Sequence, residues 1–164
     1  MTRILLLGCA GSGKTTFARR LGARTGVPVL CLDAIWQPHW TDADLPHLRS
    51  LIAAAHAADT WISDGNFAAA TFDLRLPRAD LVVWLERSRA LCAWRGVTRV
   101  LRQGEAHRVA YLSNVLRFIW GFDRINRPRI EAGLAAHGPH IPIIRFRTDR
   151  DVDGFLALAA HPAM

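Results

Sequence analysis

Residues 8–15 read Gly8-Cys9-Ala10-Gly11-Ser12-Gly13-Lys14-Thr15 and match the pattern G-x-x-x-x-G-K-[ST] at every fixed position. Glycines at these spacings let successive backbone N–H groups point into one concavity. A helix that begins near Gly13 directs the positive end of its dipole at the same place, which stabilises a phosphate. In this pattern the lysine reaches the β- and γ-phosphates, and the hydroxyl of the last residue ligates Mg²⁺. The pattern therefore predicts a site for ATP and Mg²⁺ formed by Gly8, Cys9, Ala10, Gly11, Ser12, Gly13, Lys14, Thr15 and Thr16.

The segments on both sides of this loop support the interpretation. Residues 3–7 contain a continuous apolar run after Arg3, typical of a strand buried on both faces. Phe17, Ala18 and Leu21 follow at helical spacing, and Gly26 is placed to end that helix. Lys14 is the only lysine, against twenty arginines, at the position where a compact point charge is useful. A chance glycine-rich turn is the weaker explanation.

Apolar runs alternate with helical patterns along the rest of the chain. We expect strands over residues 27–32, 60–63, 81–85 and 141–146, and helices over 42–58, 88–102, 110–122 and 128–136, with a closing helix from 152. Residues 67–78 are either irregular or a short helix. Trp36 and Trp40, in an aromatic loop, either pack in the core or form a flat wall for a ligand. The alternation predicts a parallel sheet covered by helices on both faces, with ligands at the carboxyl ends of the strands.

The bulk properties limit the class of protein. A length of 164 residues and a hydrophobic content of 51% indicate one globular domain over residues 1–164. No apolar run is long enough to span a bilayer, and the N-terminus lacks a signal-peptide layout, so we expect a cytoplasmic protein without a membrane partner. Cys9, Cys31 and Cys92 lack C-x-x-C spacing, which fits a reducing compartment. The net charge of +7 suits a polyanionic partner, and the oligomeric state stays open.

Two acidic residues end predicted strands beside the loop. Asp64 follows an apolar strand, the usual place of an aspartate that helps to hold Mg²⁺, although an Asp-Gly pair is also a favoured turn. Asp33 ends the second strand, where it either orients or deprotonates an acceptor hydroxyl, joins the metal shell, or serves as a turn residue. The two acids are also able to exchange these roles. Thr15 and Asp64 are the predicted metal ligands, and Lys14 and Asp33 are predicted catalytic residues.

Arginines are concentrated in one part of the chain. Between residues 87 and 129 there are ten arginines and two acids, a charge excess that favours an anionic ligand. Arg95 and Arg99 lie one turn apart on a predicted helix, and we expect them to neutralise the transferred phosphoryl group beneath a lid. The alternative is a solvated basic face. His137 and His140 have no metal-ligand spacing around them and are expected at the surface.

At this level the chain resembles the nucleoside-monophosphate kinase branch of the phosphate-loop proteins, and in particular small adenylate-kinase-related proteins, some of which are called DNA topology-modulation proteins. The resemblance rests on residues 8–21 (GCAGSGKTTFARRL), 31–36 (CLDAIW), 61–67 (WISDGNF) and 79–95 (ADLVVWLERSRALCAWR). It implies a P-loop three-layer α/β/α sandwich with five strands in the order 2-3-1-4-5, an arginine-rich helical lid at about residues 87–130, and ATP as phosphoryl donor. Asn66-Phe67 stands where the family has Pro-Arg, so we expect an acceptor other than AMP.

These observations predict an ATP-dependent, adenylate-kinase-like phosphotransferase that acts on a small molecule, with a nucleotide or nucleoside among the candidate acceptors. A rival hypothesis is a nucleotide-binding regulator that contacts DNA through its arginine-rich segment, although the sequence contains no recognisable DNA-reading helix. A third is a slow ATPase.

Overall fold

The computed structural model describes residues 3–35, 41–103 and 108–159. Its centre is a five-stranded, fully parallel sheet in the order β2-β3-β1-β4-β5. The strands are β1 (Arg3–Gly8), β2 (Val29–Cys31), β3 (Trp61–Asp64), β4 (Leu81–Leu85) and β5 (Ile143–Phe146). The helices are α1 (Lys14–Thr25), α2 (Leu32–Ile35), α3 (Leu45–Ala55), α4 (Ala68–Arg75), α5 (Arg89–Gln103), α6 (Arg108–Gly121), α7 (Arg127–His137) and α8 (Asp149–Ala159), with 3-10 turns η1 (Asp42–Asp44) and η2 (Leu76–Arg78) and a π-helical segment η3 (Phe122–Asn126).

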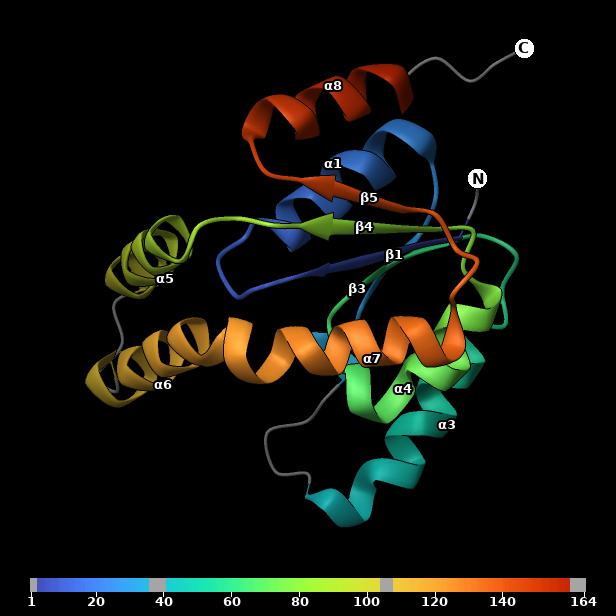
Figure 1. Cartoon of the computed structure of the whole chain (residues 1–164), viewed down its shortest axis with the longest axis horizontal. Helices are drawn as coiled ribbons and strands as arrows, with labels where there is room; N and C mark the ends of the chain where they lie inside the picture. Colours follow the sequence, from blue (N-terminus) through green and yellow to red (C-terminus); the bar gives the residue numbers. More distant parts are fainter. Residues whose placement is uncertain (1–2, 36–40, 104–107, 160–164) are drawn as a thin grey trace.

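Helices α1 and α8 cover one face of the sheet (Figure 1). Alternate residues of β1, such as Ile4 and Leu6, point to this face and pack against Phe17 of α1 and Leu156 of α8. All of these side chains are nearly or fully buried. The packing fixes α1 against the sheet and thereby places the loop before α1 at the carboxyl end of β1.

The other face is covered by α4 and α7 (Figure 1), and Cys92 of α5 joins the apolar cluster on that face. Leu5 and Leu7 of β1 point this way and join Phe72 and Ile130 in a second apolar cluster. A smaller cluster between α2 and α3 contains Leu32, Leu48 and Ile52. Burial of strand residues on both faces explains why β1 and β4 are apolar without alternation.

Segments α6, η3 and α7 form one continuous helical stretch (Figure 1). In its middle the N–H of Arg127 donates to the carbonyl of Phe122, five residues back, which is the π-helical pattern. Pro128 follows at once; it has no N–H to donate, so a local change in hydrogen bonding is accommodated there. The π-helical segment therefore joins α6 to α7 without a loop.

The predicted architecture is confirmed: the fold is a P-loop α/β/α sandwich with the expected strand order. Most strand and helix boundaries agree within a few residues, and residues 68–78 prove helical, as α4 and η2. The expected strand over 27–32 is shorter, and Asp33 does not end it, because Leu32 and Asp33 already belong to helix α2. The closing helix begins at Asp149, earlier than expected, because Thr148 and Asp151 cap it reciprocally. The proposed aromatic wall of Trp36 and Trp40 lies outside the described residues.

Candidate functional site

The loop between β1 and α1 forms an open cradle of backbone donors. Gly13 caps α1 with φ +97°, a left-handed conformation that side-chain-bearing residues rarely adopt. No side chain caps the helix within the described residues, so the first N–H groups of α1 remain available to an anion. The Nζ of Lys14 donates to the carbonyls of Gly8 (2.7 Å) and Cys9 (3.0 Å). Burial lowers the pKa of Lys14, while the nearby carboxylates of Asp64 and Asp33 act in the opposite direction.

Thr15 and Asp64 lie side by side beneath this cradle. The Thr15 hydroxyl donates to Asp64 Oδ2 at 2.5 Å, and the Asp64 residue is only 3% exposed. Burial raises the pKa of Asp64, partly offset by the Thr15 hydrogen bond and the Lys14 charge. A buried carboxylate beside a hydroxyl is a pair of hard oxygen donors that fits Mg²⁺, with phosphate oxygens and water completing the shell. In the described part of the chain, no cluster of three His, Cys, Asp or Glu side chains offers a separate metal site.

Asn66, two residues after Asp64, ties the end of β3 to the start of the loop. Its Nδ2 donates to the Gly8 carbonyl at 2.9 Å, and its Oδ1 accepts from the Gly8 N–H at 3.1 Å. Both polar atoms of the side-chain amide therefore hold the backbone of one residue of the phosphate loop. Sequence reasoning noted Asn66 only as a departure from Pro-Arg and gave it no role.

Arg75 of α4 is a buried residue that sequence reasoning missed. Its side chain is fully buried, and it donates to the Gly65 carbonyl (3.0 Å) and the Asn66 carbonyl (2.7 Å). Nε donates to Thr71 Oγ1 at 3.0 Å. No acidic side chain of the described residues pairs with it, and burial lowers the pKa of Arg75 to about 9. Arg75 therefore fixes the backbone between Asp64 and Asn66.

A hydrogen-bond chain continues from Arg75 to His56, which is 1% exposed. His56 Nδ1 lies 2.7 Å from the Ile52 carbonyl, so Nδ1 carries the proton. Nε2 of the neutral ring therefore accepts from the Ser63 hydroxyl (2.9 Å), which in turn accepts from Arg75 Nη1 (3.3 Å). Burial lowers the pKa of His56 to about 4. The histidine thus remains neutral and holds β3 through its hydrogen bond with Ser63. His137 and His140 are exposed, as expected.

Three cavities follow one another across the carboxyl edge of the sheet. The first, of about 370 Å³, lies between the start of α1 and α8 and includes Gly13, Arg87, Arg95 and Asp149. The second, of about 270 Å³, lies over the loop and shares Gly13 and Arg95 with the first. The third, of about 420 Å³, shares Lys14 and Asp33 with the second. Lys14 and Asp33 therefore stand on the boundary between the second cavity, which we call the phosphate cavity, and the third cavity.

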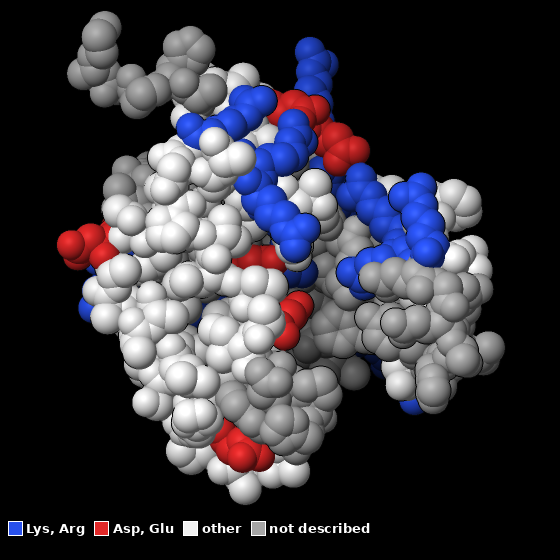
Figure 2. Space-filling model, turned by 180° about the vertical axis from the view of Figure 1, so that it is seen from behind, with Lys and Arg blue, Asp and Glu red and all other residues white. Residues whose placement is uncertain are grey.

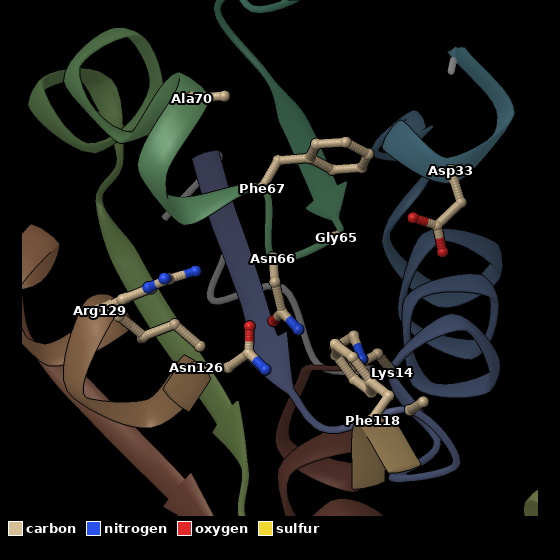
Figure 3. Close-up of a pocket in the computed structure, with 11 residues that line it drawn as sticks. Lys14, Asp33, Gly65, Asn66, Phe67, Ala70, Phe118, Asn126 and Arg129 are labelled. Carbon is tan, nitrogen blue, oxygen red and sulfur yellow. The ribbon is translucent and has the colours of Figure 1, made fainter. Parts of the chain in front are cut away.

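The third cavity is bounded by β3, α2, α4 and the α6–α7 stretch (Figure 3). Phe67 and Phe118 provide aromatic surface, and Asn126 and Arg129 approach from the side opposite Asp33. Phe67 has φ +26°, the only positive value of a non-glycine residue in the described chain. Such strain persists only where the surroundings enforce it, and it is common at ligand sites. Asn126 and Arg129 were not predicted site residues.

Arginines gather beside the hollow of the phosphate cavity (Figure 2). Arg95 and Arg99, the predicted lid residues, both line this cavity. Arg95 donates to Asp149 at 3.2 Å, and Arg99 makes no ion pair within the described residues. Among the described residues, four of the arginines between residues 87 and 129 have acidic partners, so the fold itself offsets part of the arginine excess: Arg87, Arg89, Arg95 and Arg127. That an anionic ligand offsets the rest stays a prediction.

The remaining predicted loop residues differ in where their side chains lie. Ala10, Gly11 and Thr16 line the phosphate cavity, and Ser12 lines the first cavity. The Cys9 side chain instead points into the core beside Cys92 of α5, and hydrogen bonding to Cys92 together with burial raises the pKa of its thiol. Only the backbone of Cys9 therefore faces the site.

No helix in the described part of the chain is both long and apolar enough to cross a membrane.

No protein-family model and no curated protein matches the chain, but solved structures do. The chain is similar to shikimate kinase from Acinetobacter baumannii in complex with shikimate, at 18% identity over 96% of this chain and 92% of that one, with a TM-score of 0.59. A sugar kinase from Janibacter sp. HTCC2649 is 22% identical over 97% and 92%, with a TM-score of 0.57. A gluconokinase from Sinorhizobium meliloti 1021 is 17% identical over 97% and 89%, with a TM-score of 0.55.

These likenesses identify the fold as that of the P-loop kinases. At such identities they establish the fold alone, and fold does not fix the reaction. The narrower resemblance to DNA topology-modulation proteins is not shown by these structures and stays a prediction.

Proposed function

We propose that the protein is an ATP-dependent phosphotransferase that moves the γ-phosphoryl group of Mg·ATP to a hydroxyl of a small molecule. The observation that carries this proposal is the series of three connected cavities, with Lys14 and Asp33 at the boundary between the phosphate cavity and the third cavity. A donor and an acceptor held on either side of that boundary meet at one point, which is what phosphoryl transfer requires. The folds of the similar shikimate kinase, sugar kinase and gluconokinase support the same reaction class.

The residues divide the work by their chemistry. The backbone of the loop and the first turn of α1 hold the β- and γ-phosphates, while Lys14 leaves the Gly8 and Cys9 carbonyls to follow the charge of the transferred group. Thr15 and Asp64 hold Mg²⁺, which neutralises phosphate charge when bound. Arg95 and Arg99 close over the phosphates as part of a lid that comprises residues 87–130.

Asp33 faces the acceptor. Its carboxylate makes no hydrogen bond or ion pair within the described residues, so it is free to accept a hydrogen bond from the acceptor hydroxyl. As the bond between the hydroxyl oxygen and the γ-phosphorus forms and the bond to the ADP oxygen breaks, Asp33 takes the hydroxyl proton and later releases it to water. Asp64 is the better metal ligand of the two acids because it is buried against Thr15.

The test is ADP formation from Mg·ATP, alone and with a panel of nucleosides, nucleotides, sugars and hydroxy acids. We expect acceptor-dependent turnover in the wild type and a loss of at least about 100-fold in Lys14→Ala, because a cation aimed at the transferred group is removed. Circular dichroism of the variant confirms that it is folded. ATP binding without any acceptor-dependent turnover contradicts the proposal and favours the regulatory alternative, which a DNA titration at several salt concentrations then examines.

A further inference from the structure

The third cavity contains a cation that has no partner in the described part of the chain. Arg129 makes no hydrogen bond or ion pair within the described residues, although it lines the cavity. Arg127, two residues earlier, is held by Glu86 at 2.6 Å and Asp123 at 3.0 Å. The same turn of α7 thus presents one arginine that nearby acids neutralise and one that they do not. Arg129 therefore offers the cavity a guanidinium that no acid of the described residues neutralises.

The cavity is also polarised from end to end. Arg129 and Asn126 lie on one side, and Asp33 lies on the other (Figure 3). The lining between them includes the apolar side chains of Phe67, Phe118 and Ile130, together with the polar side chains of Asn66 and Lys14. Arg129 is itself exposed to solvent, and the apolar walls beside it limit the water that competes for an anion at that end of the cavity. A ligand that satisfies both ends carries an anion at one end and a hydrogen-bond donor at the other.

We propose that the phosphoryl acceptor is a compact hydroxylated oxyanion, in which a carboxylate or a phosphate monoester binds Arg129 and Asn126 while the hydroxyl that receives the phosphoryl group binds Asp33. This inference rests on the proposed function and narrows its substrate class. The planar guanidinium of arginine suits the paired oxygens of either anion. A volume of about 420 Å³ admits a metabolite of this kind. Neutral sugars and nucleosides offer no anion to Arg129 and lie outside the proposed class.

The position of Arg129 comes from the continuous α6–α7 stretch. Phe118, Asn126 and Arg129 all belong to it, and they reach one cavity across the π-helical segment η3. π-Helical segments shift the faces of a helix and are frequent at functional sites. In the same stretch Ile119, Phe122 and Ile130 pack into the core, so the cavity side of the helix is held in place by the buried side.

The test compares binding of anions with their neutral counterparts, measured by isothermal titration calorimetry in the presence of Mg²⁺ and a non-hydrolysable ATP analogue. The probes are gluconate with glucitol, shikimate with its methyl ester, and ribose 5-phosphate with ribose, so that the carboxylate and phosphate arms are separate. We expect at least one anion to bind about 30-fold more tightly than its neutral partner, the effect of a charge-assisted pair. Arg129→Gln should abolish this preference, Arg129→Lys should retain part of it, and the affinity for the ATP analogue should not change.

Arg124→Gln is the matched control, because Arg124 is an exposed arginine of the same helical stretch that does not line the cavity. It should keep the full preference for anions. The proposal is overturned if no anion in the panel is preferred, or if the preference survives in Arg129→Gln. Anion binding that depends on Arg129 without any ADP formation would contradict the kinase function alone, whereas equal transfer to neutral acceptors would contradict this inference alone.

Discussion

Replacement of Arg75 by methionine tests how much the protein depends on a buried arginine that has no acidic partner in its described part. Methionine keeps an unbranched side chain of similar reach and removes the guanidinium. The substitution deletes hydrogen bonds to the carbonyls of Gly65 and Asn66 and to the hydroxyls of Thr71 and Ser63. It leaves both carbonyls without the donor that satisfies them in the folded chain.

Two opposing free energies decide the outcome. Burial lowers the pKa of Arg75 from 12.5 to about 9, which corresponds to roughly 5 kcal/mol of unfavourable charge burial that methionine relieves. Hydrogen bonds from a charged donor contribute about 1.5–3 kcal/mol each, so the four lost bonds amount to roughly 6–12 kcal/mol. The lost hydrogen bonds therefore outweigh the charge burial that methionine relieves. We expect Arg75→Met to lower the free energy of unfolding by about 4 kcal/mol, or roughly 8–16 °C in melting temperature for a chain of this size.

Urea unfolding followed by tryptophan fluorescence measures this change, since Trp61 and Trp84 are fully buried. Arg150→Met is the matched control, because Arg150 is exposed and unpaired within the described residues, and it should change stability by less than about 0.5 kcal/mol. Where Arg75→Met stays folded, we also expect weaker ATP binding, since Asn66 then holds Gly8 less firmly. Equal stability of Arg75→Met and wild type would refute the reasoning.

Three further predictions address other parts of the site. In the fold the pKa of His56 is lowered to about 4 from 6.5, so between these values the unfolded chain binds a proton that the folded chain does not. Up to about 3 kcal/mol of stability is therefore lost as pH falls from 6.5 to 4. His56→Gln should flatten the dependence of the free energy of unfolding on pH in this range, and an unchanged slope contradicts the assignment. Asp64→Asn should lower Mg·ATP turnover at least about 100-fold. In magnesium-free buffer at pH 7 the same variant should be as stable as the wild type or more stable, because burial raises the pKa of Asp64 and makes its charged form unfavourable. A less stable variant with full turnover argues against a metal role. Gly11→Ala brings a Cβ into collision with the Cys92 carbonyl oxygen at φ +76° and should cost about 2 kcal/mol or more, whereas Gly154→Ala, with open space around it in α8, should stabilise by about 0.5–1 kcal/mol in calorimetric melts.

The parts of the fold that sequence predicts well are those with a local signal. The phosphate loop is a fixed pattern, and β1 and β4 are apolar runs because both faces of the sheet are covered. Parallel strands bring their carboxyl ends to one edge, so Asp64, which ends β3, and Asp33, which follows β2 by two residues in α2, are both predicted to lie near the loop. The same geometry brings Lys14 and Asp33 to one cavity.

The residues that sequence reasoning missed depend on contacts without local signal. Arg75 has the appearance of a surface residue, and its partners are backbone carbonyls ten and nine residues earlier. Asn126 and Arg129 reach the third cavity only because α6, η3 and α7 are continuous, whereas the sequence predicted two separate helices. The ion pair of Arg87 with Asp149 joins residues 62 positions apart. The sequence hints at the role of Arg75 only through Thr71, whose hydroxyl lies one helical turn earlier and accepts a hydrogen bond from Arg75.

The pairing of the arginines separates structural cations from those available to ligands. Arg127 is held at 2.6 Å by Glu86, whose side chain is only 13% exposed, and at 3.0 Å by Asp123, so its exchange to a ligand would break two ion pairs, one of them to a largely buried carboxylate. Arg95 is held by contacts of 3.2 and 3.4 Å to Asp149, whose side chain is 69% exposed. Exposed ion pairs contribute about 0–1 kcal/mol, so Arg95 can turn to a phosphate at little cost. Arg99 and Arg129 have no pair to break within the described chain. Arg95, Arg99 and Arg129, which line the phosphate cavity or the third cavity, are therefore held less firmly by the fold than Arg127.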